Sequence, residues 1–315
     1  MNKPAGKKPA RLSRRAVLKK GAWMGLLGAT AGGGGVAAKQ ALEADPAAFS
    51  DALGSFFQKH YQEMTPEEVR AALARIERKA KRDHGAEIKV SNQAALPGVA
   101  FGYALNISKC KGTRRCVEAC VAENNQARQT SLQYIRVLEL DQGHMDLNHA
   151  DHYFDGATVP REGKYYLPIQ CMQCDNPPCV MACPVKATWK EPDGIVVVDY
   201  NWCIGCRYCM AACPYWARHF NWNKPRIPAA QVIPDTHYLG NRPRPGGVVE
   251  KCTFCIQRTR KGRLPACLEA CPTGARIFGN LLDPDSDIRY VLENKTVFRL
   301  KEELGTEPRF WYFTD

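Results

Sequence analysis

Hydrophobic residues recur at helical spacing in a stretch that precedes the middle of the chain. The positions that follow this spacing are Val69, Ala72, Leu73, Ile76 and Ala80. Thr65, Pro66 and Glu68 form a capping box with proline in the first turn, and Gly85 ends the run. The pattern predicts helical structure from Pro46 to about Gly85, as a docking helix pair or a spacer that packs on a main domain.

Further along, residues 193–199 (Asp-Gly-Ile-Val-Val-Val-Asp) predict a turn followed by a short strand. Hydrophobic residues make up 45% of the 315 residues and charged residues 24%. No run approaches the roughly 18 apolar residues that a spanning helix needs. We therefore exclude a polytopic membrane protein and a long disordered chain. The length suffices for two ordinary domains or for one domain with insertions.

The amino terminus resembles a twin-arginine export signal. Arg14 and Arg15 stand in the run Ser-Arg-Arg-Ala-Val-Leu-Lys, and a weakly hydrophobic stretch rich in glycine and alanine follows over 21–38. The alternative is a basic tail before a membrane anchor, but four consecutive glycines at 32–35 make a poor spanning helix. We expect residues 1–38 to export the folded protein to the periplasm after its cofactor has been inserted.

The formal net charge of +12 is concentrated in this segment. Eight of the 44 Lys and Arg residues lie within residues 1–20, which contain no acidic residue. Without residues 1–38 the chain has 36 basic and 32 acidic residues, a formal charge of +4. A chain so close to balance gives no indication of nucleic-acid binding.

Fifteen cysteines fall into four groups with short internal spacing. The second, third and fourth groups each have four cysteines, and a proline follows the last one. The groups are Cys110, Cys116 and Cys120; Cys171, Cys174, Cys179 and Cys183; Cys203, Cys206, Cys209 and Cys213; and Cys252, Cys255, Cys267 and Cys271. In the first group Thr113 stands where a fourth cysteine would sit, and Val121 replaces the proline.

This spacing is typical of the ligands of an iron–sulfur cube. Three cysteines on a tight loop can reach three corner irons, while the fourth opens a helix and serves the other cluster of a pair. Gly112 and Gly205 lie in the gaps, where amide groups can approach the sulfides. Zinc ribbons also use paired C-x2-C, but seldom four cysteines followed by proline. Disulfides between such close cysteines would be strained, and no C-x2-C-His motif for haem occurs.

The spacing also indicates which groups pair. The second and third are separated by 19 residues, as in a compact two-cluster ferredoxin, which leaves the first and fourth as an outer pair. If the last cysteine of each group binds the cluster of the other group in its pair, four sites are predicted. The inner sites are Cys171, Cys174 and Cys179 with Cys213, and Cys203, Cys206 and Cys209 with Cys183. The outer sites are Cys252, Cys255 and Cys267 with Cys120, and Cys110 and Cys116 with Cys271.

In these motifs the chain resembles the four-cluster ferredoxin-type subunits of membrane-linked redox complexes. That group includes electron-transfer subunits of molybdopterin oxidoreductases, iron–sulfur partners of nitrite-reductase-type quinone subunits, certain hydrogenase subunits and the alternative complex III. The matching stretches are residues 167–179, 203–215, 251–255 and 265–275. The resemblance covers roughly residues 100–280. It implies an α+β fold of two ferredoxin-like modules, the inner pair of motifs nested within the outer pair, after a helical extension.

The resemblance also implies a function. Electrons would pass along a row of clusters between a catalytic redox subunit, of the molybdopterin type in most of the group, and a quinone-binding membrane subunit. A multihaem cytochrome is a further candidate partner, and no catalytic site is expected in the chain itself. The expected layout is an export signal (1–38), a helical extension (39–98), a four-cluster domain (99–280) and a partner-docking tail (281–315), with membrane contact through partners.

Thr113 makes one expected cluster different from the others. Because a hydroxyl holds its proton far more tightly than a thiol, threonine is a poor iron ligand. We therefore expect three [4Fe-4S] clusters and one [3Fe-4S] cluster, with an atypical four-iron cluster or no cluster as the alternatives. Two rival functions remain open: the iron–sulfur subunit of a hydrogenase or cytochrome-containing complex, and an exported binding module stabilised by zinc or disulfides.

Overall fold

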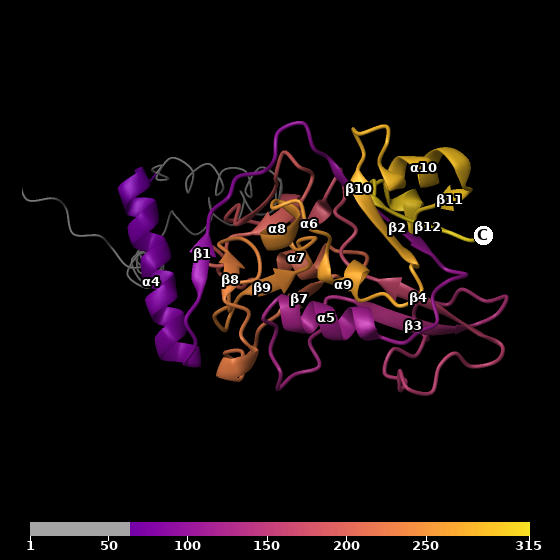
Figure 1. Cartoon of the computed structure of the whole chain (residues 1–315), viewed down its shortest axis with the longest axis horizontal. Coiled ribbons are helices and arrows are strands. Elements are labelled where there is room, and N and C mark those ends of the chain that lie inside the picture. The colour runs from indigo at the N-terminus through magenta and orange to yellow at the C-terminus, as the bar shows by residue number, and fades with distance from the viewer. Residues whose placement is uncertain (1–63) are drawn as a thin grey trace, which may run out of the picture. The chain divides into compact units, whose positions relative to one another are not determined.

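Helix α4 (Pro66–His84) is the first element in residues 64–315, which are the residues that the computed structural model describes (Figure 1). The side chain of Thr65 accepts a hydrogen bond from the amide of Glu68, whose carboxylate accepts one from the amide of Thr65. Gly85 ends the helix at a φ of +66°, a conformation that glycine adopts without strain. The predicted start and end of the helix are confirmed. The predicted signal with Arg14 and Arg15, and the stretch from Pro46 to residue 63, lie outside the described residues.

The extension that begins with α4 packs on the rest of the described chain. Leu73, Ile76 and Ala80 of α4 contact a small apolar cluster. The other members of this cluster are Ala86, Ile88, Val90, Ile227 and Val232. Strand β1 (Lys89–Ser91) then pairs in parallel with β8 (Asp235–His237). Both contacts join the extension to a segment that lies between the third and fourth cysteine groups.

The largest sheet has four strands, in the order β10 (Arg276–Asn280), β2 (Phe101–Asn106), β12 (Phe310–Phe313) and β11 (Val297–Phe298). Strand β2 is antiparallel to β10 and parallel to β12, and helix α10 (Asp287–Asn294) packs on the sheet. The rings of Tyr103 and Phe310 stack with their centroids 4.9 Å apart. The end of the predicted docking tail, 281–315, is therefore a buried strand of the domain rather than a free appendage. Partner contact by the tail stays a prediction.

Three antiparallel two-stranded sheets surround the cysteine groups. They pair β3 (Arg136–Asp141) with β4 (Lys164–Ile169), β5 (Thr188–Lys190) with β6 (Val196–Val198), and β7 (Arg218–Phe220) with β9 (Val249–Lys251). Strand β6 confirms the short strand predicted from residues 193–199. The mixed helix and sheet content agrees with the predicted α+β class.

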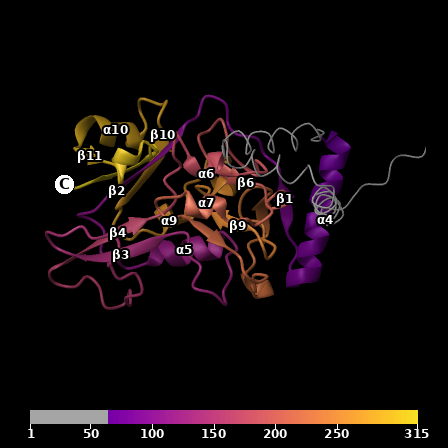
Figure 2. The ribbon, with the colours of Figure 1, turned by 180° about the vertical axis from the view of Figure 1, so that it is seen from behind.

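Short helices bring distant cysteine groups together. They are α5 (Arg115–Glu123), α6 (Pro178–Met181), α7 (Tyr208–Ala211), α8 (Ile256–Thr259) and α9 (Ala266–Glu269). Helix α5 packs against α9, and α6 packs against α7. In Figures 1 and 2, α6 and α7 lie between β1 on one side and β10 on the other. None of the helices in residues 64–315 is long and apolar enough to cross a membrane.

Candidate iron–sulfur sites

All four cysteine groups share a left-handed residue in the first gap between ligand positions. This residue is Gly112 (φ +72°), Gln173 (φ +47°), Gly205 (φ +74°) or Phe254 (φ +50°). A residue other than glycine adopts this conformation at a cost of about 1–2 kcal/mol. Its recurrence at Gln173 and Phe254 therefore indicates that the loop requires it. The turn lets the cysteines before and after it face the same space.

Two of these positions accept only glycine. A side chain at Gly112 would overlap the buried ring of Tyr166, and one at Gly205 would overlap the backbone oxygen of Gly247. The amide of Gly112 hydrogen-bonds the thiol of Cys110. The structure thus explains the glycines that we singled out in the gaps of the first and third groups.

Thr113 lies at the loop position that a cysteine occupies in the third group. The loop at 110–116 and the loop at 203–209 both have a left-handed glycine at the third residue and a left-handed arginine at the fifth, Arg114 or Arg207. A helix begins directly after each arginine. Thr113 therefore corresponds to Cys206, and it lines a small cavity together with Cys110, Cys116 and Cys271.

The structure places thiols of each predicted set near one another, and we number the four predicted sets as sites I to IV; that these thiols are cluster ligands stays a prediction. Site I comprises Cys110, Cys116 and Cys271 with Thr113; site II Cys120, Cys252, Cys255 and Cys267; site III Cys171, Cys174, Cys179 and Cys213; and site IV Cys183, Cys203, Cys206 and Cys209. All fifteen cysteines lie in the described part of the chain, and none of them forms a disulfide there.

The outer sites I and II join segments from opposite ends of the domain. In site I, burial raises the pKa of Cys110 to about 11, with contributions from the thiols of Cys116 and Cys271. In site II, burial and then the three other thiols hold the pKa of Cys120 well above its ordinary value. The side-chain amide of Asn124 lies 3.5 Å from the Sγ of Cys120 and 3.6 Å from the Sγ of Cys255.

In the inner sites III and IV, thiols of one predicted set likewise lie near one another. Burial raises the pKa of Cys174 to about 12, and the other three thiols of site III contribute. In site IV, burial raises the pKa of Cys209 to about 11, and the thiol of Cys203 contributes. Cys206 lies in the same loop, and Cys183 follows α6, which packs on the α7 helix of site IV.

Thiols of neighbouring sites lie close enough to influence one another's pKa, which places the sites in the order I, II, III, IV. Cys116 of site I faces Cys267 of site II. Cys252 of site II faces Cys171 of site III. Cys179 of site III faces Cys209 of site IV. The order follows from long-range packing, and no spacing in the sequence indicated it.

Backbone amide groups are directed at the thiols that follow helices α6, α7 and α9. In the inner pair, the amide of Ala187 lies 3.2 Å from the Sγ of Cys183, and the amide of Ala217 hydrogen-bonds Cys213 in the same way. Ala275 and Cys271 repeat this arrangement in site I. Cys120, which no proline follows, instead receives the side-chain amides of Asn124 and Gln126, the latter at 3.4 Å. Amide donors of this kind stabilise anionic sulfur.

The residues present fit an iron–sulfur cluster in each site. The side chain of Arg218, five residues after Cys213, lies against Cys179, and its Nε and Nη1 atoms are buried without a partner. Buried donors rarely stay unsatisfied, so an acceptor such as a cluster sulfide is expected there. Arg276, five residues after Cys271, contacts Cys116. We did not single out these two arginines, although the repeated Cys-Pro-x-x-Ala-Arg motif marks both of them.

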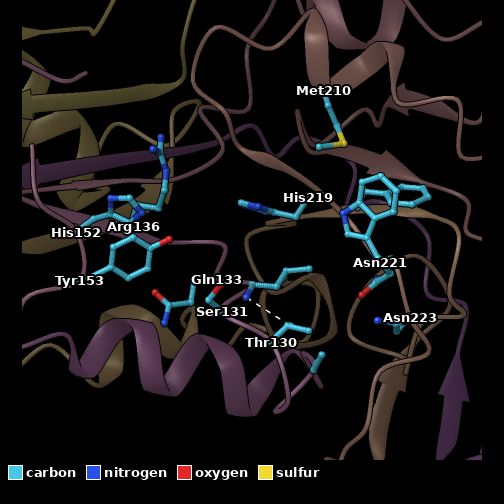
Figure 3. A pocket seen from close by; sticks show the side chains of 14 residues that line it. Thr130, Ser131, Gln133, Arg136, His152, Tyr153, Met210, His219, Asn221 and Asn223 are labelled. Carbon is cyan, nitrogen blue, oxygen red and sulfur yellow. Dashed lines mark hydrogen bonds between the residues drawn. The ribbon is translucent and has the colours of Figure 1, made fainter. Parts of the chain in front are cut away.

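A cavity of about 360 Å³ lies beside helix α7 and therefore beside site IV. Figure 3 shows Met210 of that helix on one side, His152 with Tyr153 on the other, and His219 between them. Burial lowers the pKa of His219 to about 4, so its ring is neutral at pH 7. The lining offers aromatic and polar side chains but neither a thiol nor a carboxylate.

Comparison with known proteins supports iron–sulfur clusters in this chain. A family model described as a 4Fe-4S dicluster domain matches residues 163–245 and 239–281, which contain the second, third and fourth cysteine groups. This match favours iron–sulfur clusters over the zinc alternative.

Several relatives extend the similarity to most of the domain. The chain is 40% identical over 242 residues to the menaquinone reductase iron–sulfur cluster-binding subunit of Nitratidesulfovibrio vulgaris, covering 69% of this chain and 89% of that protein. It is 42% identical to an iron–sulfur subunit of the Hdr-like menaquinol oxidoreductase of Archaeoglobus fulgidus, covering 62% and 71% of the two chains. It is 37% identical to a selenate reductase subunit of Mesobacillus selenatarsenatis, covering 72% and 76%.

Proposed function

We propose a specific role for this chain, which belongs to the family of iron–sulfur electron-transfer subunits of membrane-linked reductase complexes. Its four sites hold one cluster each, and electrons enter the row at one end and leave it at the other. The observation that carries this proposal is the arrangement of four sets of buried thiols in a single order from site I to site IV.

The ligands of each cluster are the cysteines of its site. When bound, each cluster would accept and donate one electron at a time. The chain holds the thiols in place through the left-handed loops and directs amide donors at their sulfur atoms. It also excludes water, because Cys120, Cys171, Cys209 and Cys252 are among the buried residues. This environment favours electron transfer between neighbouring sites over loss of electrons to solvent.

The two pairs of sites form two ferredoxin-like modules, the inner one nested within the outer one. Helices α6 and α7 support the inner module, since they pack together and carry cysteines of both inner sites. Helices α5 and α9 support the outer module in the same way. The four-stranded sheet belongs to the outer module, because β2 leads into the first cysteine group and β10 follows the fourth.

The partners are a catalytic redox subunit of the molybdopterin type and a quinone-binding membrane subunit. The names of the relatives support this, since they are subunits of a menaquinone reductase, a menaquinol oxidoreductase and a selenate reductase. A multihaem cytochrome is a further candidate. Purification of the tagged chain from its native membranes is expected to recover both subunits. Recovery of the chain alone, at gentle detergent concentrations, would contradict the proposal.

We also propose that residues 1–38 direct export to the periplasm through Arg14 and Arg15. Replacement of both arginines by lysine is expected to leave the protein, with its clusters, in the cytoplasm. Fractionation of cells and immunodetection of the chain measure this. Unchanged export of the variant would remove the twin-arginine assignment without affecting the cluster sites.

Site I holds a three-iron cluster, because Thr113 replaces the ligand that Cys206 supplies in site IV. An oxidised three-iron cluster has an unpaired electron, whereas oxidised four-iron cubes give no paramagnetic resonance signal. We expect the signal in the oxidised wild-type protein and its loss in Thr113→Cys, with a gain of one iron per chain. A silent oxidised wild-type sample with about sixteen irons per chain would show that site I holds a four-iron cluster.

A further inference from the structure

Six cationic side chains are buried in the part of the chain that the structure describes, and three of them have an evident partner. Arg244 pairs with Glu250 at 2.9 Å, and Arg260 pairs with Asp193 at 2.9 Å. Arg242 lies over the ring of Tyr238, 4.7 Å from its centroid. The other three are Arg276, Lys251 and Arg218, for which no ion pair with a carboxylate occurs among the described residues.

Arg276 lies at the junction of sites I and II. Its Nη2 atom donates to the Sγ of Cys116 at 3.3 Å. Its Nη1 atom donates to Gln170 at 3.0 Å and to the hydroxyl of Tyr103 at 3.4 Å. That hydroxyl in turn lies 3.4 Å from the Sγ of Cys267. The guanidinium group therefore contacts site I directly and site II through one hydroxyl.

Arg218 has the corresponding position at the junction of sites III and IV. Its Nη2 atom donates to the Sγ of Cys179 at 3.0 Å and to the hydroxyl of Thr188 at 2.9 Å. The guanidinium group also lies near Cys209 of site IV and influences its thiol. Both arginines begin the strand that follows a Cys-Pro-x-x-Ala sequence, β7 or β10, which explains why they reach equivalent places.

Lys251 lies at the remaining junction, between sites II and III. It is the last residue of strand β9 and directly precedes Cys252, and its side chain is fully buried. Its Nζ atom donates to the carbonyl oxygen of Cys252 at 2.6 Å and lies 3.4 Å from Oε1 of Gln173, in the loop of site III. Cys252 and Cys171 meet at the same place.

A buried cation without an anion is costly, since it loses its hydration and gains no charge partner. The thiolate ligands and clusters of the flanking sites would supply that negative charge. In return, a cation in a medium of low dielectric constant stabilises an added electron on either side of it. When an electron moves from one flanking site to the other, the total charge of the two sites is unchanged. The cation between them therefore stabilises the electron before and after the transfer.

We propose that Arg276, Lys251 and Arg218 are electrostatic positioning residues, one at each junction of the row, that raise the reduction potentials of both flanking sites. The inference rests on the proposed function, since it requires clusters in sites I to IV. It assigns each cation to two sites only: Arg276 to I and II, Lys251 to II and III, and Arg218 to III and IV.

The test is a redox titration of the purified protein, followed by paramagnetic resonance, for Arg276→Gln, Lys251→Gln and Arg218→Gln. Each variant is expected to shift the two flanking potentials downward by at least a tenfold change in the reduction equilibrium, about 59 mV for one electron. The other two potentials stay at their wild-type values. Arg207→Gln is the matched control, because Arg207 adjoins Cys206 but is exposed, so solvent screens its charge.

Arg276→Lys and Arg218→Lys separate charge from hydrogen bonding. The Lys variants keep the positive charge and are expected to keep the wild-type potentials. Loss of a flanking cluster in a Gln variant, with all four clusters retained in the corresponding Lys variant, also supports the role of the charge. Unchanged potentials in the Gln variants, equal shifts at all four sites, or equal shifts in the Lys and Gln variants would overturn the inference. A wild-type protein with fewer than four clusters would instead contradict the proposed function.

Discussion

The inner and outer pairs of sites differ in how they are held together. Sites III and IV come from one continuous stretch, 171–213, with complete ligand sets and a proline after each group. Sites I and II combine 110–120 with 252–271, lack one cysteine and one proline, and depend on the four-stranded sheet. The outer pair is therefore assembled by long-range packing, whereas the inner pair is defined mainly by local loop geometry.

This difference predicts that damage to the sheet affects the outer sites first. In Phe310→Ala, the lost side chain is fully buried and stacks on Tyr103, whose hydroxyl contacts Cys267. Such a truncation costs about 3–5 kcal/mol of unfolding free energy. We expect sites I and II to lose iron during mild urea treatment while sites III and IV retain it. Iron analysis and paramagnetic resonance of the remaining clusters measure this.

Phe298→Ala is the matched control for Phe310→Ala. Phe298 belongs to the edge strand of the same sheet and stacks on Tyr312, but it is 36% exposed. Its truncation is expected to cost about 1 kcal/mol, because little apolar surface is removed from the core. Simultaneous loss of iron from all four sites in Phe310→Ala would show that the two pairs unfold as one unit.

The same difference explains what could be predicted from the sequence. Helix α4 depends on spacing within a few residues, and its predicted start and end agree with the structure. The spacing also predicts the four ligand sets, which stay a prediction. The role of residues 310–313 depends on pairing with β2, about two hundred residues earlier, and no local pattern reveals that pairing. The order of the sites and the junction positions of Arg218 and Arg276 likewise follow from packing between distant loops.

Replacement of Gly112 and Gly205 tests whether the loops of the two pairs require glycine to the same extent. Gly112→Ala places a methyl group against the ring of Tyr166, and Gly205→Ala places one against a backbone oxygen. With the left-handed conformation, each is expected to cost about 1–3 kcal/mol. Each variant should lower iron occupancy only in its own site, I or IV.

Gly274→Ala is the control for these glycine variants. Gly274 also has a positive φ, of +61°, and follows Cys271 of site I, but a Cβ there would meet nothing within 4 Å. The variant carries only the conformational cost, about 1 kcal/mol. If Gly274→Ala lowers iron in site I as much as Gly112→Ala does, contact with Tyr166 is not the cause. Thermal unfolding and iron content per chain decide between the two outcomes.

The smallest expected effect concerns the side-chain amides near Cys120. They take the place of the backbone amide that serves the cysteines followed by proline. Asn124 donates to the Sγ atoms of Cys120 and Cys255 and to the carbonyl oxygen of Cys120. Because amide donors to sulfur raise cluster potentials, Asn124→Ala is expected to lower the potential of site II by less than a tenfold change in equilibrium, about 59 mV. The inner sites keep their potentials, since a backbone amide serves Cys213. Asn124 also caps the end of α5, so a loss of thermal stability without any change in the site II potential would assign it a purely structural role.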